Sequence, residues 1–315
     1  LCRHGNIPER YPQRMTEKIL VIKIGATGDV IRTTTLLHLF PNAEITWITA
    51  SYNKLILPQH HPALHRIVAI EELHGSGIPE EHFNRIISLD DDLKCASLAS
   101  SISHDTLFGA FVENGKVLYT EDAREWFDMG LSSRFGKERA DELKWENTHS
   151  YQDILFRMLG RTFNDHPYFL FEDIHKVRKP LRVGIESRSG NRWPTKIWHR
   201  YPELGAALQA EGYDVVFFED RDTLKEYMED IAECALLISG DTLGMHIALA
   251  LNIPCVTVFT CTSAVEIHGY GLMEKIVSPE LKKAYYKNEY VPEAVASISL
   301  EAFLEAVHKR LPLKR

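Results

Sequence analysis

Short runs of apolar, often β-branched residues alternate with polar or amphipathic stretches along most of the chain. Such runs are typical of buried parallel strands, and the stretches between them are typical of crossover helices. The predicted strands are residues 18–24, 43–49, 66–70, 85–89, 181–185, 213–218, 235–239 and 254–259. The predicted helices are residues 30–40, 151–159, 201–211, 223–234, 242–251 and 300–308. The pattern therefore predicts an α/β protein.

The strand–helix series runs twice, with an interruption between the two runs. Periodicity is weaker at about 108–139, where residues 111–119 are expected to form a hairpin around Asn114-Gly115, a dipeptide favoured in type I′ turns. The charged stretch 172–180 is the expected linker. We therefore expect two doubly wound domains with the carboxyl ends of their strands on a shared cleft. Their predicted ranges are residues 1–175 and residues 176–315, the second closed by a C-terminal helix, and the role of residues 1–16 stays open.

The composition is that of a globular protein and argues against several classes. Of 315 residues, 44% are hydrophobic and 25% charged, and the net charge of −8 disfavours nucleic-acid binding. No apolar run approaches the roughly 20 residues that a membrane span needs, and the first residues resemble no signal peptide. Five scattered cysteines without a Cys-x-x-Cys pair favour a reduced, cytoplasmic setting.

Two glycine-bearing turns after predicted strands hold the candidate chemistry. Residues 25–29 (Gly-Ala-Thr-Gly-Asp) place Asp29 at the mouth of a sheet, where it either acts chemically or caps the next helix. Residues 239–246 (Ser-Gly-Asp-Thr-Leu-Gly-Met-His) place Asp241 where we expect a helix cap. The amides and dipole of that helix start attract phosphate, and His246 adds a donor or a proton. Neither turn has the dinucleotide or P-loop spacing, which disfavours a nicotinamide-dependent oxidoreductase.

Three segments in a fixed order extend this interpretation. They are residues 18–34 around the first turn, residues 192–198 (Arg-Trp-Pro-Thr-Lys-Ile-Trp), and residues 238–271 around the second turn. Together they resemble glycosyltransferase family 9, the ADP-heptose:lipopolysaccharide heptosyltransferases. The resemblance implies a GT-B fold, in which two Rossmann-like doubly wound domains face a central cleft. It also implies inverting sugar transfer that needs no metal ion.

The resemblance gives Asp29 the role of general base, because an acceptor hydroxyl must lose its proton as it attacks the anomeric carbon. Lys196 matches the phosphate-binding lysine of the family, and the leaving nucleoside diphosphate needs such a cation or oriented amides. The other residues expected to bind the donor are Ser187, Arg188, Asp241, Thr242, Leu243, Gly244 and His246. Those expected on the acceptor side are Gly28, Arg32 and Thr33, with packing or capping as the alternative for the last two.

Some positions allow two interpretations. The segment 192–198 can be aligned with the family on Trp198 or on Trp193. The alignment on Trp198 places Lys196 at the phosphate-binding lysine of the family. The alignment on Trp193 places Asn191 at that position and leaves Arg192 as the nearby cation. The glycine that the family places after Asp241-Thr242 is displaced by one residue. Asp90, Asp91 and Asp92 either contact acceptor hydroxyls or form a solvated turn. Glu219 either contacts a ribose or is a solvated acid in a loop. Glu266 and His268 are expected near the donor cleft.

The resulting prediction is a cytoplasmic glycosyltransferase that moves a sugar, expected to be heptose from ADP-heptose, onto a saccharide or glycolipid acceptor. The partners are the nucleotide sugar, the acceptor and transiently the inner face of the inner membrane, with no nucleic acid, metal or further cofactor. One alternative is a transferase of the same fold with another nucleotide sugar. The other is a non-catalytic nucleotide-sugar-binding protein.

Overall fold

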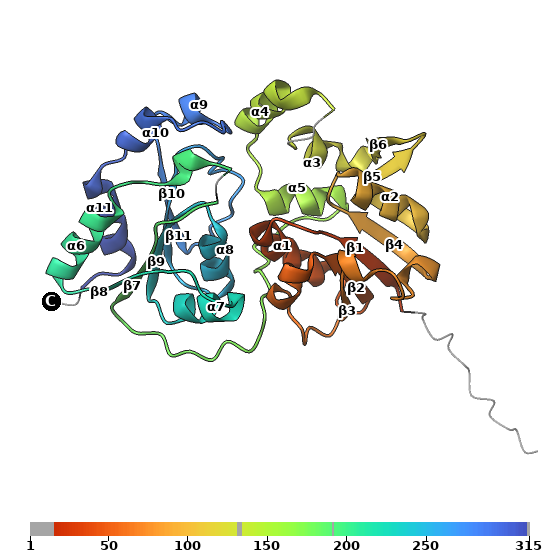
Figure 1. Ribbon diagram of the computed structural model, residues 1–315, viewed down its shortest axis with the longest axis horizontal. Helices are drawn as coiled ribbons and strands as arrows, with labels where there is room; N and C mark the ends of the chain where they lie inside the picture. The colour runs from red at the N-terminus through yellow and green to blue at the C-terminus, as the bar shows by residue number, and fades with distance from the viewer. Residues whose placement is uncertain (1–15, 131–133, 191, 314–315) are drawn as a thin grey trace, which may run out of the picture.

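The computed structural model describes residues 16–130, 134–190 and 192–313. Within these ranges the chain forms a six-stranded and a five-stranded sheet, each covered by helices, which lie next to one another along the long axis of the molecule (Figure 1). We call the part with the first sheet the N-terminal half and the part with the second sheet the C-terminal half. Residues 1–15 of the predicted first domain and Asn191 lie outside the described residues.

The sheet of the N-terminal half has the order β3-β2-β1-β4-β5-β6. Its strands are β1 (Lys18–Ile22), β2 (Glu44–Thr49), β3 (Leu64–Ala69), β4 (His82–Ser88), β5 (Ser103–Glu113) and β6 (Lys116–Tyr119). Neighbours pair in parallel except β5 and β6, which form the expected hairpin. Asn114 and Gly115 have φ angles of 51° and 75°, and both positive values suit a type I′ turn.

Some helices of the N-terminal half connect these strands, and others follow the last strand, β6, along the chain. The α-helices are α1 (Thr27–Thr33), α2 (Leu93–Ser101), α3 (Arg124–Asp128), α4 (Gly136–Glu146) and α5 (Tyr151–Met158). Short 3₁₀ segments are η1 (Thr34–Leu39), η2 (Ser51–Ile56), η3 (Ile70–Glu72), η4 (Ile78–Glu80) and η5 (Glu121–Ala123). A capping box between Ser150 and Asp153 starts α5 and so fixes where that helix enters the space between the two halves.

The sheet of the C-terminal half is parallel throughout and has the order β11-β10-β9-β7-β8. Its strands are β7 (Arg182–Glu186), β8 (Asp214–Phe217), β9 (Leu236–Gly240), β10 (Cys255–Phe259) and β11 (Met273–Val277). Its helices are η6 (Pro194–Lys196), α6 (Tyr201–Glu211), α7 (Leu224–Ala232), α8 (Leu243–Ala250), α9 (Leu281–Ala284), α10 (Pro292–Ala296) and α11 (Leu300–Arg310). The final helix α11 packs on β10, β11 and α6.

Every predicted strand exists, with bounds shifted by a few residues. The helix expected at 30–40 begins earlier, at Thr27, and becomes 3₁₀ at Thr34, so Asp29 lies inside its first turn. The sequence did not predict α2, α4 or β11. Of residues 90–92, Asp92 is exposed, as expected for a solvated turn, and it also caps α2 by accepting hydrogen bonds from the amides of Lys94 and Cys95 at 3.0 and 3.1 Å.

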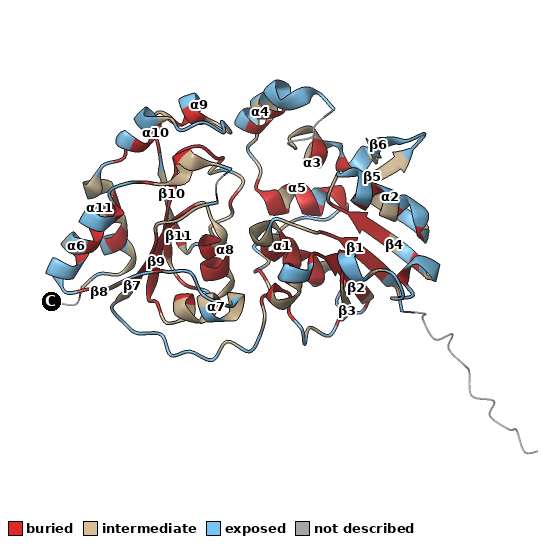
Figure 2. Cartoon of the chain, viewed as in Figure 1, coloured by how far each residue is buried: buried red, intermediate tan, exposed pale blue. Residues whose placement is uncertain are grey.

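Residues 159–181, which contain no helix or strand, lead from one half to the other, and the predicted boundary at 175/176 falls within this segment. The halves also share buried contacts: one hydrophobic cluster includes Val30 and Leu155 from the N-terminal half with Met245 and Ile267 from the C-terminal half. Figure 2 shows buried strands in both sheets and buried segments of α1, α5 and α8 between them. This packing places the carboxyl end of β1 opposite that of β9.

The Gly109→Ala variant should be strongly destabilised. Gly109 on β5 has φ 114°, and an added Cβ would lie 1.9 Å from the carbonyl oxygen of Ser88 on β4. Backbone strain and the clash together should lower the free energy of unfolding by about 2–4 kcal/mol, measured by urea denaturation. Gly75→Ala is the control, because Gly75 also has a positive φ but its Cβ would meet no atom within 4 Å. Equal effects of the two variants would contradict the role of the clash.

Candidate active site

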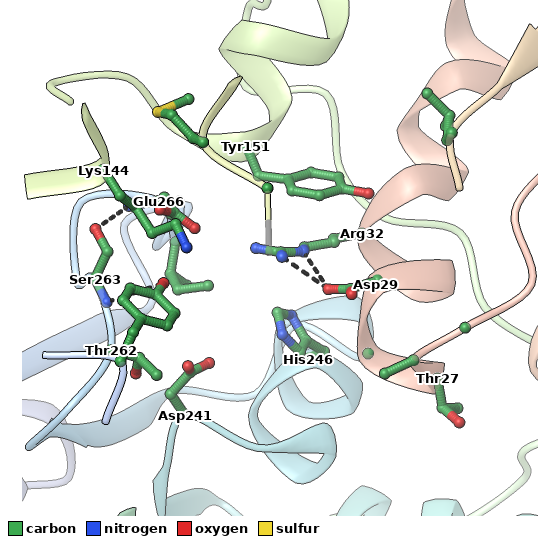
Figure 3. A pocket seen from close by; sticks show the side chains of 18 of the residues that line it. Thr27, Asp29, Arg32, Lys144, Tyr151, Asp241, His246, Thr262, Ser263 and Glu266 are labelled. Atoms are coloured by element: carbon green, nitrogen blue, oxygen red, sulfur yellow. Dashed lines mark hydrogen bonds and ion pairs between the residues drawn. The ribbon is translucent and has the colours of Figure 1, made fainter. Parts of the chain in front are cut away.

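A cavity of about 800 Å³ lies between the two halves, at the carboxyl ends of strands from both sheets. Figure 3 shows Asp29 and Arg32 on one side of it, Asp241 on the other, and His246 between them. Its lining from the N-terminal half includes Lys23, Gly28, Asp29, Arg32, Asp90, Trp126, Lys144 and Tyr151. Its lining from the C-terminal half includes Arg192, Trp193, Lys196, Asp241, Thr242, Leu243, His246, Thr262, Ser263, Glu266 and Tyr286.

Asp29 forms an ion pair with Arg32 one helical turn later. Its Oδ1 atom accepts hydrogen bonds from Nε and Nη2 of Arg32 at 3.0 and 2.7 Å. The guanidinium of Arg32 lies 3.7 Å from the ring centre of Tyr151, which supports it from α5. The N-cap of α1 is Ala26, without a side-chain cap, so the alternative that Asp29 merely caps this helix is wrong.

The charges around Asp29 keep it ionised. Burial alone would raise the pKa of this carboxyl, but the positive charges of Arg32 and Lys23 outweigh burial and hold the pKa below its usual value. Burial and the nearby charge of Arg32 lower the pKa of His246 to about 4, so this imidazole is neutral at neutral pH. The site therefore contains an ionised carboxylate and an uncharged histidine.

Lys23 and Asp90 form a second ion pair under the first turn. Lys23 is only 5% exposed, and its ammonium donates hydrogen bonds to the carbonyl of Gly25 and to Oδ1 of Asp90, both at 2.5 Å. Burial alone would lower the pKa of Lys23, but the charge of Asp90 outweighs burial and raises it. The other carboxylate oxygen of Asp90 accepts from the amide of Ile24. Asp90 therefore fixes the turn that presents Asp29.

Across the cavity, Lys196 binds Asp241 through both its main chain and its side chain. The ammonium donates to the carbonyl oxygen at 2.6 Å and to Oδ2 at 3.1 Å. Burial alone would raise the pKa of Asp241, but the charge of Lys196 outweighs it and the pKa is about 2. The expectation that Asp241 caps α8 is wrong, because the N-cap is Thr242 without a side-chain bond and the carboxylate turns to Lys196 instead.

The halves approach most closely where α1 meets α8. A Cβ added to Gly28 would lie 2.7 Å from Cδ2 of His246, so only glycine fits there without a shift of the ring. The Nδ1 atom of His246 is buried and has no hydrogen-bond partner among the described residues. Gly244, the glycine displaced by one residue, is required by packing. A Cβ at this position would clash with the hydroxyl of Tyr227, which donates a hydrogen bond to Glu186 at 2.6 Å.

The structure brings most of the predicted site residues to one cavity. Those that line it are Gly28, Asp29, Arg32, Lys196, Asp241, Thr242, Leu243 and His246. Lys196 and Arg192 both line it, so the two alignments of that segment point to the same wall. Glu266 also lines it, whereas His268 does not, and its Nε2 atom lies 3.1 Å from Oδ1 of Asp165 instead.

The remaining predicted site residues lie elsewhere. Thr33 is buried, and its hydroxyl bonds to the carbonyl of Asp29 at 2.6 Å and to the hydroxyl of Tyr151 at 2.7 Å. Arg188 lines a neighbouring cavity of about 430 Å³ together with Glu219, and it forms ion pairs with Glu186 and Asp220. Ser187 and Gly244 line neither cavity. Their roles toward a ligand stay predictions.

Sequence reasoning missed several lining residues. Lys23 carried a usable signal, because a lysine inside an apolar strand run must find a partner when buried. Tyr151 and Lys144 carried none, since only the packing of α4 and α5 against the other half brings them to the cavity. In the described part of the chain, no three His, Cys, Asp or Glu side chains are grouped so that they could hold a metal ion. No helix within the described ranges is long and apolar enough to cross a membrane.

Similarity to known proteins agrees with this geometry. The family model described as glycosyltransferase family 9 (heptosyltransferase) matches residues 220–293. Lipopolysaccharide heptosyltransferase 1 of Salmonella typhimurium is 21% identical over 292 residues, which cover 81% of this chain and 92% of that protein. The protein is a family 9-like glycosyltransferase.

Solved structures of similar proteins show the same fold over nearly the whole family 9-like chain. The crystal structure of the glycosyl transferase family 9 from Veillonella parvula has a TM-score of 0.63 at 19% identity, with 94% of this chain and 97% of that chain covered. E. coli heptosyltransferase WaaC with ADP has a TM-score of 0.52 at 15% identity, with 94% and 99% covered. The fold is GT-B, in which two Rossmann-like domains face a central cleft.

The Arg32→Met variant should shift the pH dependence of sugar transfer. Without the guanidinium, burial is less well opposed and the pKa of Asp29 rises. The general-base role expected for Asp29 requires the deprotonated carboxylate, so with that role activity is present above this pKa and is lost as the pH falls through it. The acid limb of kcat/KM should therefore move to higher pH. Arg161→Met, at an exposed position far along the chain, should leave the limb in place. An unmoved limb in Arg32→Met would contradict the pairing.

Proposed function

We propose that this glycosyltransferase is inverting and metal-independent, and that it moves heptose from ADP-heptose onto a saccharide or glycolipid acceptor. The observation that carries the proposal is the ionised Asp29 on one wall of the cavity, opposite Lys196 and the start of α8 on the other. For the donor, support comes from E. coli heptosyltransferase WaaC, which is described with ADP and with ADP-2-deoxy-2-fluoro heptose. Transient contact with the inner membrane face, a cytoplasmic location and the absence of any cofactor belong to the same proposal.

The N-terminal half supplies the base. Both contacts of Arg32 use Oδ1 of Asp29, so among the described residues Oδ2 remains to accept the proton of the acceptor hydroxyl. The hydroxyl oxygen then forms a bond to the anomeric carbon while the bond from that carbon to the diphosphate oxygen breaks. Attack from the side opposite the leaving group inverts the configuration. A general base of this kind contributes about 10²–10⁴-fold to the rate.

The C-terminal half supplies the groups that stabilise the leaving diphosphate. The ammonium of Lys196 and the amides at the start of α8, at Thr242 and Leu243, line the same wall. A fixed cation and the positive end of a helix dipole both favour the charge that develops on the leaving oxygen. They offer the stabilisation that a metal ion provides in other transferases, which supports transfer without a metal.

Replacing Asp29 by Asn separates an enzyme from a non-catalytic nucleotide-sugar binder. Asn keeps the shape but accepts no proton, so transfer from ADP-heptose should slow by about 10²–10⁴-fold while donor affinity changes little. Transfer is measured as ADP release in the presence of a glycolipid acceptor, and affinity by calorimetry. Asp173→Asn, an exposed carboxylate in the connecting segment, is the control. Undiminished transfer in Asp29→Asn would contradict the role of Asp29.

Thermal stabilisation by nucleotides tests the donor. ADP, UDP, GDP and CMP and their sugars are each added to the purified protein. A ligand at about 100 times its dissociation constant should raise the free energy of unfolding by about 2.7 kcal/mol. We expect ADP and ADP-heptose to stabilise selectively. Selective stabilisation by another nucleotide would contradict ADP-heptose as the donor but leave the proposed transfer reaction in place. No stabilisation by any of these ligands would contradict the proposed donor site.

A further inference from the structure

Glu266 is a half-buried residue in the cavity wall whose carboxyl the proposed reaction does not use. It lies in the loop after β10, and its main-chain carbonyl accepts a hydrogen bond from the amide of Tyr151 at 3.0 Å. Because Tyr151 is the first residue of α5, this bond ties a loop of the C-terminal half to the N-terminal half. Figure 3 shows the Glu266 side chain beside Lys144 of α4, on the wall opposite Arg32.

The carboxyl of Glu266 is incompletely satisfied by the protein. Its Oε1 atom is buried and has no hydrogen-bond partner among the described residues. Lys144 is 6% exposed, and its ammonium lies 3.7 Å from the ring centre of Tyr286 and 4.0 Å from Oδ1 of Asp141. Leaving a buried carboxylate oxygen without a donor costs free energy, so such an atom in a cavity wall points to a ligand that supplies the donor.

The charges around Glu266 define which ligand group fits. Burial raises the pKa of Glu266, although the positive charges of Lys144 and Arg32 oppose the rise. Asp241 and Asp29 line the same cavity, and their negative charges also act on Glu266. A carboxyl in such surroundings repels phosphate but accepts a hydrogen bond from a sugar hydroxyl. Lys144 beside it offers a donor to the same or a neighbouring hydroxyl.

The position of Glu266 favours the donor sugar over the acceptor. The same loop contains Thr262 and Ser263, which line the cavity together with Asp241 at the start of α8. A sugar attached to a diphosphate at Lys196 and α8 therefore lies between these groups and Asp29. We propose that Glu266 determines donor specificity by hydrogen-bonding a hydroxyl of the transferred sugar, and that Lys144 beside it supplies a positive charge. This assignment rests on the proposed function, since it requires a nucleotide sugar in the cavity.

The test compares the binding of ADP and of ADP-heptose by calorimetry in wild type, Glu266→Gln and Glu266→Ala. ADP affinity should stay within about twofold, because ADP lacks the sugar. ADP-heptose should bind about 10- to 100-fold more weakly to Glu266→Ala, as expected for the loss of one charge-assisted hydrogen bond. Glu266→Gln should lose less, since the amide still accepts one. Glu305→Gln, an exposed carboxyl of α11, should change neither affinity.

A further variant tests the part played by Lys144. Lys144→Met should weaken ADP-heptose but not ADP, and adding it to Glu266→Ala should cause little further loss, because the two side chains act together. Full additivity would contradict the pairing. If Glu266→Ala weakens ADP and ADP-heptose equally, or leaves the binding of both unchanged, the role of Glu266 is overturned while the proposed function stands. Failure of the wild type to bind any nucleotide sugar would overturn the proposed function and this assignment together.

Discussion

The close packing of α1 against α8 is the constraint on which the site depends. Gly28 has no side chain and lies against the ring of His246, so the first turns of the two helices meet without a spacer. Because each helix follows a strand of its own sheet, this contact brings Asp29 and Asp241 to the walls of one cavity. A bulkier residue at position 28 would separate both walls at once.

Three carboxylates brought into this cavity, Asp29, Asp90 and Asp241, each pair with a cation that limits the cost of burial. Arg32 pairs with Asp29 and Lys196 with Asp241, and in both cases the pKa stays below the usual range despite burial. Glu266 is the contrast: burial prevails over Lys144 and its pKa is raised. Arg32 and Lys196 donate hydrogen bonds directly to Asp29 and Asp241, whereas Lys144 lies nearest to the ring of Tyr286. A direct bond does not always suffice, because burial raises the pKa of Asp90 although Lys23 donates to it.

Features that depend on residues close together in the sequence could be predicted, and features that depend on contacts between distant residues could not. Strand runs and the two turns were predictable, because periodicity and glycine positions are local properties. The cap assigned to Asp241 was wrong, since local propensity gave no hint of the ammonium of Lys196, which arrives from a different loop. Lys144 and Tyr151 were out of reach for the same reason: α4 and α5 become cavity walls only through packing between the halves.

The position of the displaced glycine, Gly244, is explained by side-chain packing rather than by contact with a ligand. Gly244 stands inside α8, and the room it leaves is filled by the hydroxyl of Tyr227, which bonds to the buried Glu186. Glu186 in turn pairs with Arg188 at the rim of the neighbouring cavity. The glycine therefore serves the packing of Tyr227, while Thr242 and Leu243, which precede it, line both cavities. Because the helix start itself carries the oriented amides, a phosphate site there needs the fold of this turn more than a glycine at position 243.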